Sequence, residues 1–435
     1  MKRFISSLFV YVLIFTIILP LTACSGEGKG IGSGIGKIKS DNLMDSLADS
    51  EIITDYDYDP TEYEQQKMTD FAVRIFQNSI EEGKNTLISP TSVIVALSMT
   101  TNGAKNNTLT QMEEVMGLST EELNVYLYNY RKNLPQGDKY KLQLANSIWF
   151  TNHERFTVNE SFLRVNQAYY QADIYQSAFD AATLKDINLW IEQKTDGMIK
   201  NILDEIPPEA VMYLINALAF EAEWSDTYDE GQVRKGIFTT ENGVEQSVDM
   251  MYSDESVYIE DEQATGFIKY YNGEKYAFVA LLPNEGVTVS EYVAGLSGEE
   301  IRELLENPKQ IHVNAALPQF ESEYDVLMND VLIKMGMTDA FHARNADFTG
   351  LGTSTDGNIF INRVIHKTYI TVGPQGTKAG AATVVEMMDE CAPFYEESKT
   401  VYLDRPFVYM LIDCENNQPF FMGTCMSVVE ACGLE

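Results

Sequence analysis

The sequence has few of the residues and none of the motifs that most enzymes use for catalysis. It contains four histidines and five cysteines among 435 residues, and no two cysteines have the CxxC spacing of a zinc ribbon or a redox pair. No GxSxG, HExxH or Walker lysine motif is present. The sequence therefore indicates neither an enzyme nor a site for a metal or another cofactor.

Positive charge is also scarce. The chain has 31 lysines and arginines against 65 aspartates and glutamates, which gives a net charge of −34. A field of this sign repels nucleic acid and anionic lipid headgroups. We therefore expect no nucleic-acid partner, and no contact with a membrane except through a covalent anchor.

The N-terminus carries an apolar run. Two cationic residues precede residues 4–19, and small residues then lead to Cys24. This pattern is typical of a secretory signal that is cut before a lipid-modified cysteine. The run is short for a membrane span and stops at Pro20, although an ordinary signal peptide with an incidental cysteine, or a membrane helix, are alternatives. We predict a lipoprotein signal peptide over residues 1–23 and lipid attachment at Cys24.

The composition changes twice after the signal. Residues 24–59 are first rich in glycine and then acidic, without apolar periodicity, which predicts a flexible tether. Residues 60–435 show no internal linker or repeat, and 45% of the whole chain is hydrophobic, enough for a large core. Length alone suggests two domains, but the missing linker favours one.

Apolar periodicity and turn signals predict a mixture of helices and strands in this domain. Because they do not follow a regular βαβ order, the α+β class is indicated. Helices are expected at residues 62–79, 90–104, 108–117, 186–203 and 324–335; strands at 142–150, 211–220, 310–320, 407–412 and 420–429; and a hairpin at 267–282 with its turn at 272–273.

One long stretch, residues 373–407, separates a strand-like run at 368–372 from the apolar run at 407–412. Loops of this length are usually functional or disordered. If residues 376–389 were extended, the side chains on one face would be small or apolar from Thr377 to Met387. The two charged residues between 378 and 388, Lys378 and Glu386, would lie on the other face. The loop could therefore become a strand. Alternatively, it is a flexible linker in which the alternation of uncharged and charged positions is accidental.

The residues of this stretch resemble the reactive loop of the serpins, a family of protease inhibitors. LDRPF at residues 403–407 is similar to the signature that follows the loop. Other serpin-like motifs occur in order along the chain: NTLISPTS at 85–92, NALAFEAEW at 216–224, DFTGL at 347–351 and PFFMG at 419–423. The segment similar to the serpin hinge consists of Gly376, Thr377, Lys378, Ala379, Gly380, Ala381, Ala382 and Thr383.

The resemblance implies the serpin fold, in which helices surround a large central mixed β-sheet and an exposed reactive-centre loop can insert into that sheet as an extra strand. It also implies roles for five residues. Ser89, Ser92, Asn216 and His366 match the shutter beneath the sheet, and Trp224 matches the breach where insertion begins. Taken one by one, these residues could equally be satisfied core groups.

The resemblance also implies a reactive bond. In serpins the attacked residue lies fourteen positions after the hinge glycine, which gives Glu390, with Cys391 on the leaving side. An acidic residue there suits a protease with a cationic specificity pocket. If the attacked bond were shifted to Val385, Met387 or Met388, an elastase-like or subtilisin-like protease would fit better.

Two residues depart from the serpin pattern. Pro374 and Lys378 stand where serpins usually carry glutamate. Pro374 removes a backbone donor just before the segment that would insert. We therefore expect it to affect the rate of insertion more than the capacity to insert.

Together these features predict a suicide inhibitor that forms a covalent complex with a target serine protease. We expect a monomer outside the cell, anchored by its lipid to the outer face of a bacterial cell membrane. The alternatives are an inhibitor of cysteine proteases, and a non-inhibitory binding or adhesion lipoprotein with the serpin fold, which a protease would merely cut.

Overall fold

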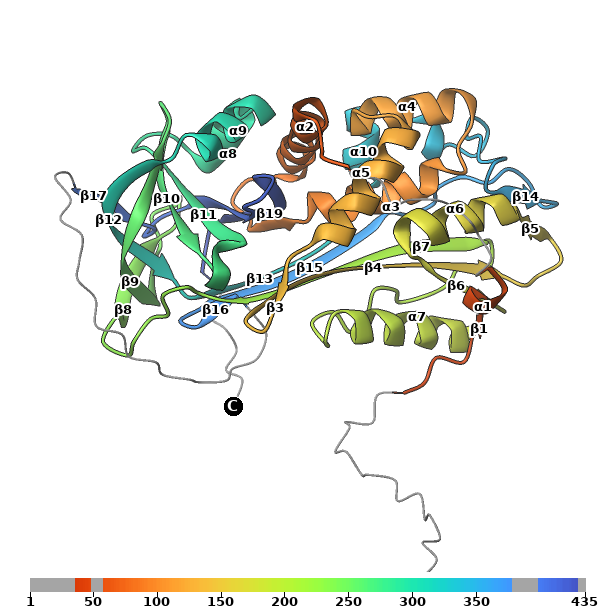
Figure 1. Cartoon of the computed structure of the whole chain (residues 1–435), viewed down its shortest axis with the longest axis horizontal. Coiled ribbons are helices and arrows are strands. Elements are labelled where there is room, and N and C mark those ends of the chain that lie inside the picture. The colour runs from red at the N-terminus through yellow and green to blue at the C-terminus, as the bar shows by residue number, and fades with distance from the viewer. Residues whose placement is uncertain (1–35, 48–57, 378–397, 429–435) are drawn as a thin grey trace, which may run out of the picture. The chain divides into compact units, whose positions relative to one another are not determined.

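A computed structural model describes residues 36–47, 58–377 and 398–428 (Figure 1). Lys37–Glu435 form one compact unit. In the described part of the chain, no helix is both long enough and apolar enough to cross a membrane.

Several helices begin at signals that are visible in the sequence. Thr61, Ser119, Thr288 and Ser297 each form a capping box with the glutamate three residues on, which satisfies backbone donors at the start of the helix. The helices are α1 (Met44–Leu47), α2 (Glu62–Ser79), α3 (Pro90–Thr101), α4 (Asn106–Met116), α5 (Thr120–Asn133), α6 (Glu160–Tyr170), α7 (Ala181–Lys194), α8 (Val289–Gly295), α9 (Gly298–Glu306) and α10 (Asn329–Met335), with 3₁₀ turns at Asn272–Glu274 and Asp339–Phe341.

The central sheet has the strand order β1-β6-β4-β7-β16-β15-β13, with β3 paired to β4. Because β4 pairs with β6 in parallel and with β7 antiparallel, the sheet is mixed, as the resemblance implied. Its strands are β1 (Asp41–Asn42), β3 (Gln136–Gly137), β4 (Tyr140–Thr151), β6 (Asp173–Ser177), β7 (Met212–Glu223), β13 (Phe320–Leu327), β15 (Ile365–Gly373) and β16 (Gly376–Thr377).

The second sheet has the order β17-β12-β9-β10-β11-β18-β19-β2, with β8 paired to β9. Every residue of β18 and β19 is buried, which fits their mostly apolar sequences. The strands are β2 (Thr86–Ile88), β8 (Val233–Thr239), β9 (Glu245–Glu260), β10 (Ala264–Tyr270), β11 (Tyr276–Pro283), β12 (Lys309–Pro318), β17 (Ser398–Tyr402), β18 (Phe407–Asp413) and β19 (Gln418–Cys425); β5 (Phe156–Val158) and β14 (Gly352–Ser354) form a separate pair.

Helices cover both faces of the central sheet (Figure 1). On one face, α7 packs Trp190 and Ile191 against Trp149 of β4 and Ile215 of β7. On the other face, α3, α5 and α6 contribute apolar side chains to the largest core cluster, which also includes Ile148 of β4. The central strands therefore lie between two apolar layers, which a further strand could share.

Two predicted helices differ from the structure. The helix expected at residues 186–203 ends at Lys194, because the chain turns at Gly197 with a φ of 80° and the Asn188 side chain caps the backbone of residues 202–203. The helix expected at residues 324–335 begins only at Asn329. Residues 324–327 belong to β13 and pair with residues 365–368 of β15.

The tether predicted for residues 24–59 also differs from the structure over residues 37–47, which pack against the domain. The Asp186 carboxylate accepts hydrogen bonds from the backbone N–H groups of Lys39 and Ser40 at 3.0 and 2.7 Å. β1 pairs with β6, and Leu47 is buried in the main core. Residues 37–47 contain no glycine, but their contacts depend on Asp186 and β6, which are distant in the sequence.

Candidate functional site

The central sheet is parted between β7 and β15. These strands have twelve and nine residues, but β16, which lies between them, has only two. Gly376 and Thr377 pair with Glu223 and Ala222 of β7 on one side, and with Gly373 and Val372 of β15 on the other. Along the rest of their described length, no ladder pair joins β7 to β15. The site is therefore a gap that already holds the first two residues of a strand.

The two residues of β16 fit the gap closely. Thr377 is only 2% exposed, and its hydroxyl hydrogen-bonds with the Tyr271 hydroxyl. Gly376 has a φ of +152°, and a Cβ at this position would lie 2.0 Å from the Ala222 carbonyl oxygen. A larger residue than glycine would therefore push the two strands apart. The inward-facing threonine matches the parity predicted from the sequence.

The turn before β16 is held at three successive carbonyls. The Trp224 indole N–H donates to the Gly373 carbonyl at 2.8 Å, and the Trp224 backbone N–H donates to Gln375 at 2.9 Å. The Tyr228 backbone N–H donates to the Pro374 carbonyl at 3.0 Å. Because Pro374 lies in the turn between β15 and β16, its missing N–H removes none of the ladder pairs that join these strands.

A buried lysine supports this turn from below. The Lys269 ammonium lies 2.8 Å from the Glu255 carboxylate, 4.6 Å from the Tyr228 ring centroid and 5.5 Å from that of Trp224. Burial lowers the pKa of Lys269, but Glu255 and Tyr228 more than reverse this, so the pKa lies above its usual value. A charged lysine therefore fixes the two rings whose backbones hold the turn.

We expect Trp224→Phe to loosen the turn, because it removes the hydrogen bond to Gly373 while it keeps an aromatic ring in the core. The free energy of unfolding should fall by about 1 kcal/mol, measured by denaturation in urea. Hydrogen exchange at the amides of Gly376 and Thr377 should speed up as well. Trp149→Phe is the control, since it removes a similar bond from Trp149 to the Ser147 hydroxyl elsewhere in the sheet. Equal effects of both variants on exchange at these two amides would contradict a specific role for Trp224.

Four of the predicted site residues form one hydrogen-bonded chain beneath the sheet. The Ser89 backbone N–H donates to His366 Nε2 at 3.0 Å, and the Ser92 backbone N–H donates to Ser89 Oγ at 3.1 Å. The Ser92 hydroxyl in turn donates to the Asn216 side-chain oxygen, and the Asn216 amide donates to that of Asn146 at 2.8 Å. The chain runs from β15 through the start of α3 to β7 and β4, and so crosses the gap.

His366 is neutral in this arrangement. Its ring is fully buried, and burial lowers the pKa of His366 to about 4. Nε2 accepts a hydrogen bond from Ser89, which a protonated imidazole cannot do. Protonation would therefore break the link between β15 and α3.

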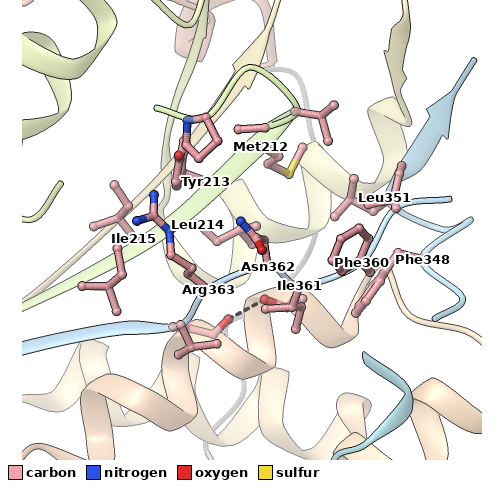
Figure 2. A pocket seen from close by; sticks show the side chains of 18 of the residues that line it. Met212, Tyr213, Leu214, Ile215, Phe348, Leu351, Phe360, Ile361, Asn362 and Arg363 are labelled. Carbon is pink, nitrogen blue, oxygen red and sulfur yellow. Dashed lines mark hydrogen bonds between the residues drawn. The ribbon is translucent and has the colours of Figure 1, made fainter. Parts of the chain in front are cut away.

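A cavity of about 620 Å³ lies along the gap below β16 (Figure 2). Most of its lining is apolar, and Phe360 at its rim is 39% exposed. It is lined from three sides: by residues 212–216 of β7, by residues 361–366 leading into β15, and by residues of α3 including Val93, Ala96 and Leu97. The cavity therefore offers apolar surface to whatever enters the gap.

The structure thus groups the predicted residues at two ends of the gap. Trp224 lies with Gly376 and Thr377 at one end of the gap. The other four residues, Ser89, Ser92, Asn216 and His366, lie toward the other end. The roles assigned to all of them stay predictions. Twelve predicted site residues lie outside the described residues: Cys24, Lys378, Ala379, Gly380, Ala381, Ala382, Thr383, Val385, Met387, Met388, Glu390 and Cys391.

Sequence reasoning missed Asn146, Tyr271 and Lys269. An asparagine inside the apolar run at 142–150 was a usable signal for Asn146, because polar groups in buried strands need partners. Nothing in the sequence brings Lys269 next to Trp224, since that contact depends on how the two sheets meet. Among the described residues, no group of three or more metal-binding side chains is close enough to hold a metal ion.

Comparisons with known proteins agree with this architecture. A family model described as Serpin (serine protease inhibitor) matches residues 66–428. The crystal structure of the thermophilic serpin tengpin in the native state is similar, with a TM-score of 0.83 and 46% identity over 89% of this chain and 100% of that chain. A serpin-like protein of Thermococcus kodakarensis is 27% identical over 96% of this chain and 98% of its own. Human leukocyte elastase inhibitor is 28% identical over 82% of this chain and 97% of its own.

Proposed function

The chain belongs to the serpin family, and we propose that it inhibits serine proteases as a suicide substrate. The observation that carries this proposal is the parted central sheet, in which Gly376 and Thr377 already occupy the place of a missing strand. An inhibitor that works by strand insertion needs such a gap.

In the first step the target protease attacks the reactive loop. Its serine oxygen bonds to the carbonyl carbon of Glu390, the peptide bond to Cys391 breaks, and the leaving amine takes up the proton. The products are an ester between the loop and the protease and a new N-terminus at Cys391. Up to this point the reaction is that of an ordinary substrate.

Full insertion requires cleavage as long as β17 stays paired with β12. Residues 378–397 are held at both ends, by Thr377 in the central sheet and by Ser398 in β17 of the second sheet. Insertion of ten residues moves the cleavage site by about 33 Å along the gap. β17 lies on the far side of β16 from the start of β7 (Figure 1), so the other ten residues of an uncut chain would have to span at least that distance with no slack.

Two gains drive the second step. An inserted strand makes backbone hydrogen bonds with both β7 and β15, and it covers the apolar lining of the 620 Å³ cavity. Among the described residues, only Gly376 and Thr377 make these strand contacts, and we propose that the uncut protein stores the remaining free energy in a metastable sheet. The covalently attached protease is carried along before it can hydrolyse the ester.

The class of target follows from the loop sequence. Glu390 suits a glutamyl-specific serine protease, and Val385, Met387 or Met388 suits an elastase-like or subtilisin-like one. Human leukocyte elastase inhibitor is among the relatives. We place the protein on the outer face of a bacterial membrane through a lipid on Cys24, a location that rests on residues 1–24 alone.

The test is to mix residues 37–435 with elastase-like, subtilisin-like and glutamyl-specific proteases, and to follow the products by denaturing gels and intact mass. We expect a complex that resists detergent, and a released peptide that begins at Cys391. A peptide that begins at Met388 or Asp389 would move the reactive bond. If every protease cuts the loop and stays active, the protein is a binding protein and not an inhibitor. A complex with a cysteine protease only would change the target class.

A further inference from the structure

The cavity along the gap has two unlike ends. Its volume of about 620 Å³ is that of a small-molecule site, and such sites are mostly apolar with a few polar groups. Figure 2 shows Arg363 and Tyr213 at one end of the lining, and Phe348, Leu351 and Phe360 at the other. We propose that the cavity binds a straight-chain fatty acid, with the carboxylate on Arg363 and the hydrocarbon chain toward Phe348 and Leu351.

The shape of the cavity suits a linear molecule. Residues 212–216 of β7 form one wall, and residues 361–366, which lead into β15, form the other. Four steps along β7 cover about 13 Å. The width between the walls is that of the one strand that β16 begins farther along the gap. An extended hydrocarbon chain therefore fits this space better than a broad ring system does.

The far end of the cavity is apolar. Phe348 and Leu351 are buried members of the main core cluster, and Leu97 and Ala96 of α3 line the cavity beside them. Phe360, at the rim, is one of the few large apolar side chains that the fold leaves exposed. Exposed apolar surface at the mouth of an apolar cavity is surface that a ligand can cover. Each methylene buried here should raise the affinity about fourfold.

Arg363 can hold a carboxylate without giving up its present contacts. Its guanidinium hydrogen-bonds with the Tyr213 hydroxyl and, at 3.4 Å, with the Glu205 carbonyl. A guanidinium has five N–H donors, in a fork that matches the two oxygens of a carboxylate. The Glu205 carboxylate is exposed, so water and salt screen it from a bound anion. Several described arginines have no carboxylate partner, and Arg363 is the one of them that lines the cavity.

The other charged side chains of the lining do not offer a second place for the carboxylate. Arg155 lies 3.5 Å from the Asp356 carboxylate and donates to the Ala210 carbonyl at 3.2 Å. Asp356 and Glu209 are acidic and would repel an anion beside them. The carboxylate therefore has one favourable position, at Arg363, which fixes the direction of the chain in the cavity.

This inference goes beyond the proposed function, because binding needs only the cavity of the uncut protein and no protease. A bound fatty acid would cover the apolar wall that an inserted strand would also cover, so it should oppose insertion. Only that consequence rests on the proposed function.

A chain-length series tests the apolar end without any variant. Residues 37–435, which form one compact unit, are titrated calorimetrically with octanoate, decanoate and dodecanoate, each below the concentration at which it forms micelles. We expect one molecule to bind per chain, with a Kd that tightens about fourfold for each added methylene. A Kd that does not change with chain length, or binding of several molecules per chain, overturns the site.

Filling the cavity tests its location. Ala96→Phe places a large side chain where Ala96 has one methyl group, so it should weaken the binding of dodecanoate and of dodecanol alike, by at least about tenfold. Ala294→Phe is the matched control, because Ala294 is exposed on α8 and does not line the cavity, and its affinities should equal those of the wild type. Unchanged affinities in a folded Ala96→Phe variant overturn the location.

The choice of head group tests Arg363. We expect the wild type to bind dodecanoate about tenfold more tightly than dodecanol, because only the carboxylate makes charged hydrogen bonds. Arg363→Gln should remove this preference by weakening dodecanoate alone. Arg344→Gln is the matched control, since Arg344 is exposed and does not line the cavity, and it should keep the preference. If Arg363→Gln weakens both probes equally, or if Arg344→Gln loses the preference as well, Arg363 does not hold the carboxylate.

These titrations separate the inference from the proposed function. They contain no protease and use the uncut chain, so their failure would leave inhibition untouched. A protein that binds dodecanoate with the expected pattern but traps no protease would keep this site and lose the proposed function.

Discussion

Under the proposed function, Thr377→Arg should give a protein that a protease cuts as a substrate and that no longer traps it. The covalent complex with the target protease should fall at least about 100-fold, while cleavage of the loop continues at its normal rate. Thr377 is 2% exposed and lies between β7 and β15 against the Tyr271 hydroxyl. An arginine cannot stay there, because a buried unpaired charge costs several kcal/mol. β16 would leave the gap, and insertion would have to begin against the cost of burying that charge.

Gln375→Arg is the matched control for this prediction. It introduces the same side chain two residues earlier, in the turn before β16, where the residue is partly exposed and only its backbone carbonyl is used by Trp224. This variant should keep most of the complex formation, measured as moles of inhibitor consumed per mole of protease trapped. If Gln375→Arg and Thr377→Arg lose complex formation equally, the effect comes from charge near the loop and not from the gap.

The parity of the loop could be predicted from its sequence because strand geometry has a strict period of two. Thr377 faces the core in the structure, as the uncharged face of residues 376–389 required. The fold class and the buried strands near the C-terminus could be predicted for a similar reason. Their apolar runs leave few other arrangements once turn residues interrupt them.

Features that depend on tertiary contacts could not be predicted. The end of α7 at Lys194 is set by the Asn188 side chain, which caps a backbone fifteen residues away. The packing of residues 37–47 depends on Asp186, which is far away in the sequence. From the sequence, Pro374 was expected to remove a backbone N–H donor from a strand. In the structure it lies in the turn between β15 and β16, where no ladder pair uses that N–H group. Its effect on the rate of insertion stays a prediction.

The parted sheet itself is a tertiary property. Sequence motifs identified Ser89, Ser92, Asn216 and His366 by resemblance, but only coordinates show that they form one hydrogen-bonded chain across the gap. That chain joins β15 to β7 through α3, below the point where β16 ends. It is therefore the polar contact that a strand advancing along the gap meets, and its protonation state controls how firmly the two strands are linked.

Acid should weaken the uncut protein through His366. Burial lowers the pKa of His366 to about 4 in the folded protein, against about 6.5 in the unfolded chain. Above pH 6.5 the ring is neutral in both states, so it contributes no pH dependence. As the pH falls from 6.5 to 4, the unfolded chain takes up a proton that the folded protein does not, and stability falls. The expected loss is about 3 kcal/mol at pH 4, with no further loss from this group below that pH.

The measurement is the urea midpoint of the uncut protein at pH steps from 7 to 4, for the wild type and for His366→Gln. Glutamine can accept the Ser89 hydrogen bond but does not titrate, so the variant curve should be flatter over this range, even if the variant is somewhat less stable at pH 7. His342→Gln is the control, because His342 is exposed, and its curve should follow the wild type. The difference between the two variant curves isolates His366 from the carboxylates, which titrate in every protein. If both variants lose stability as steeply as the wild type, His366 does not control the acid response. If only His366→Gln is flat, proton uptake by His366 on unfolding accounts for the acid response, and the link across the gap stays intact in the folded protein until the pH approaches 4.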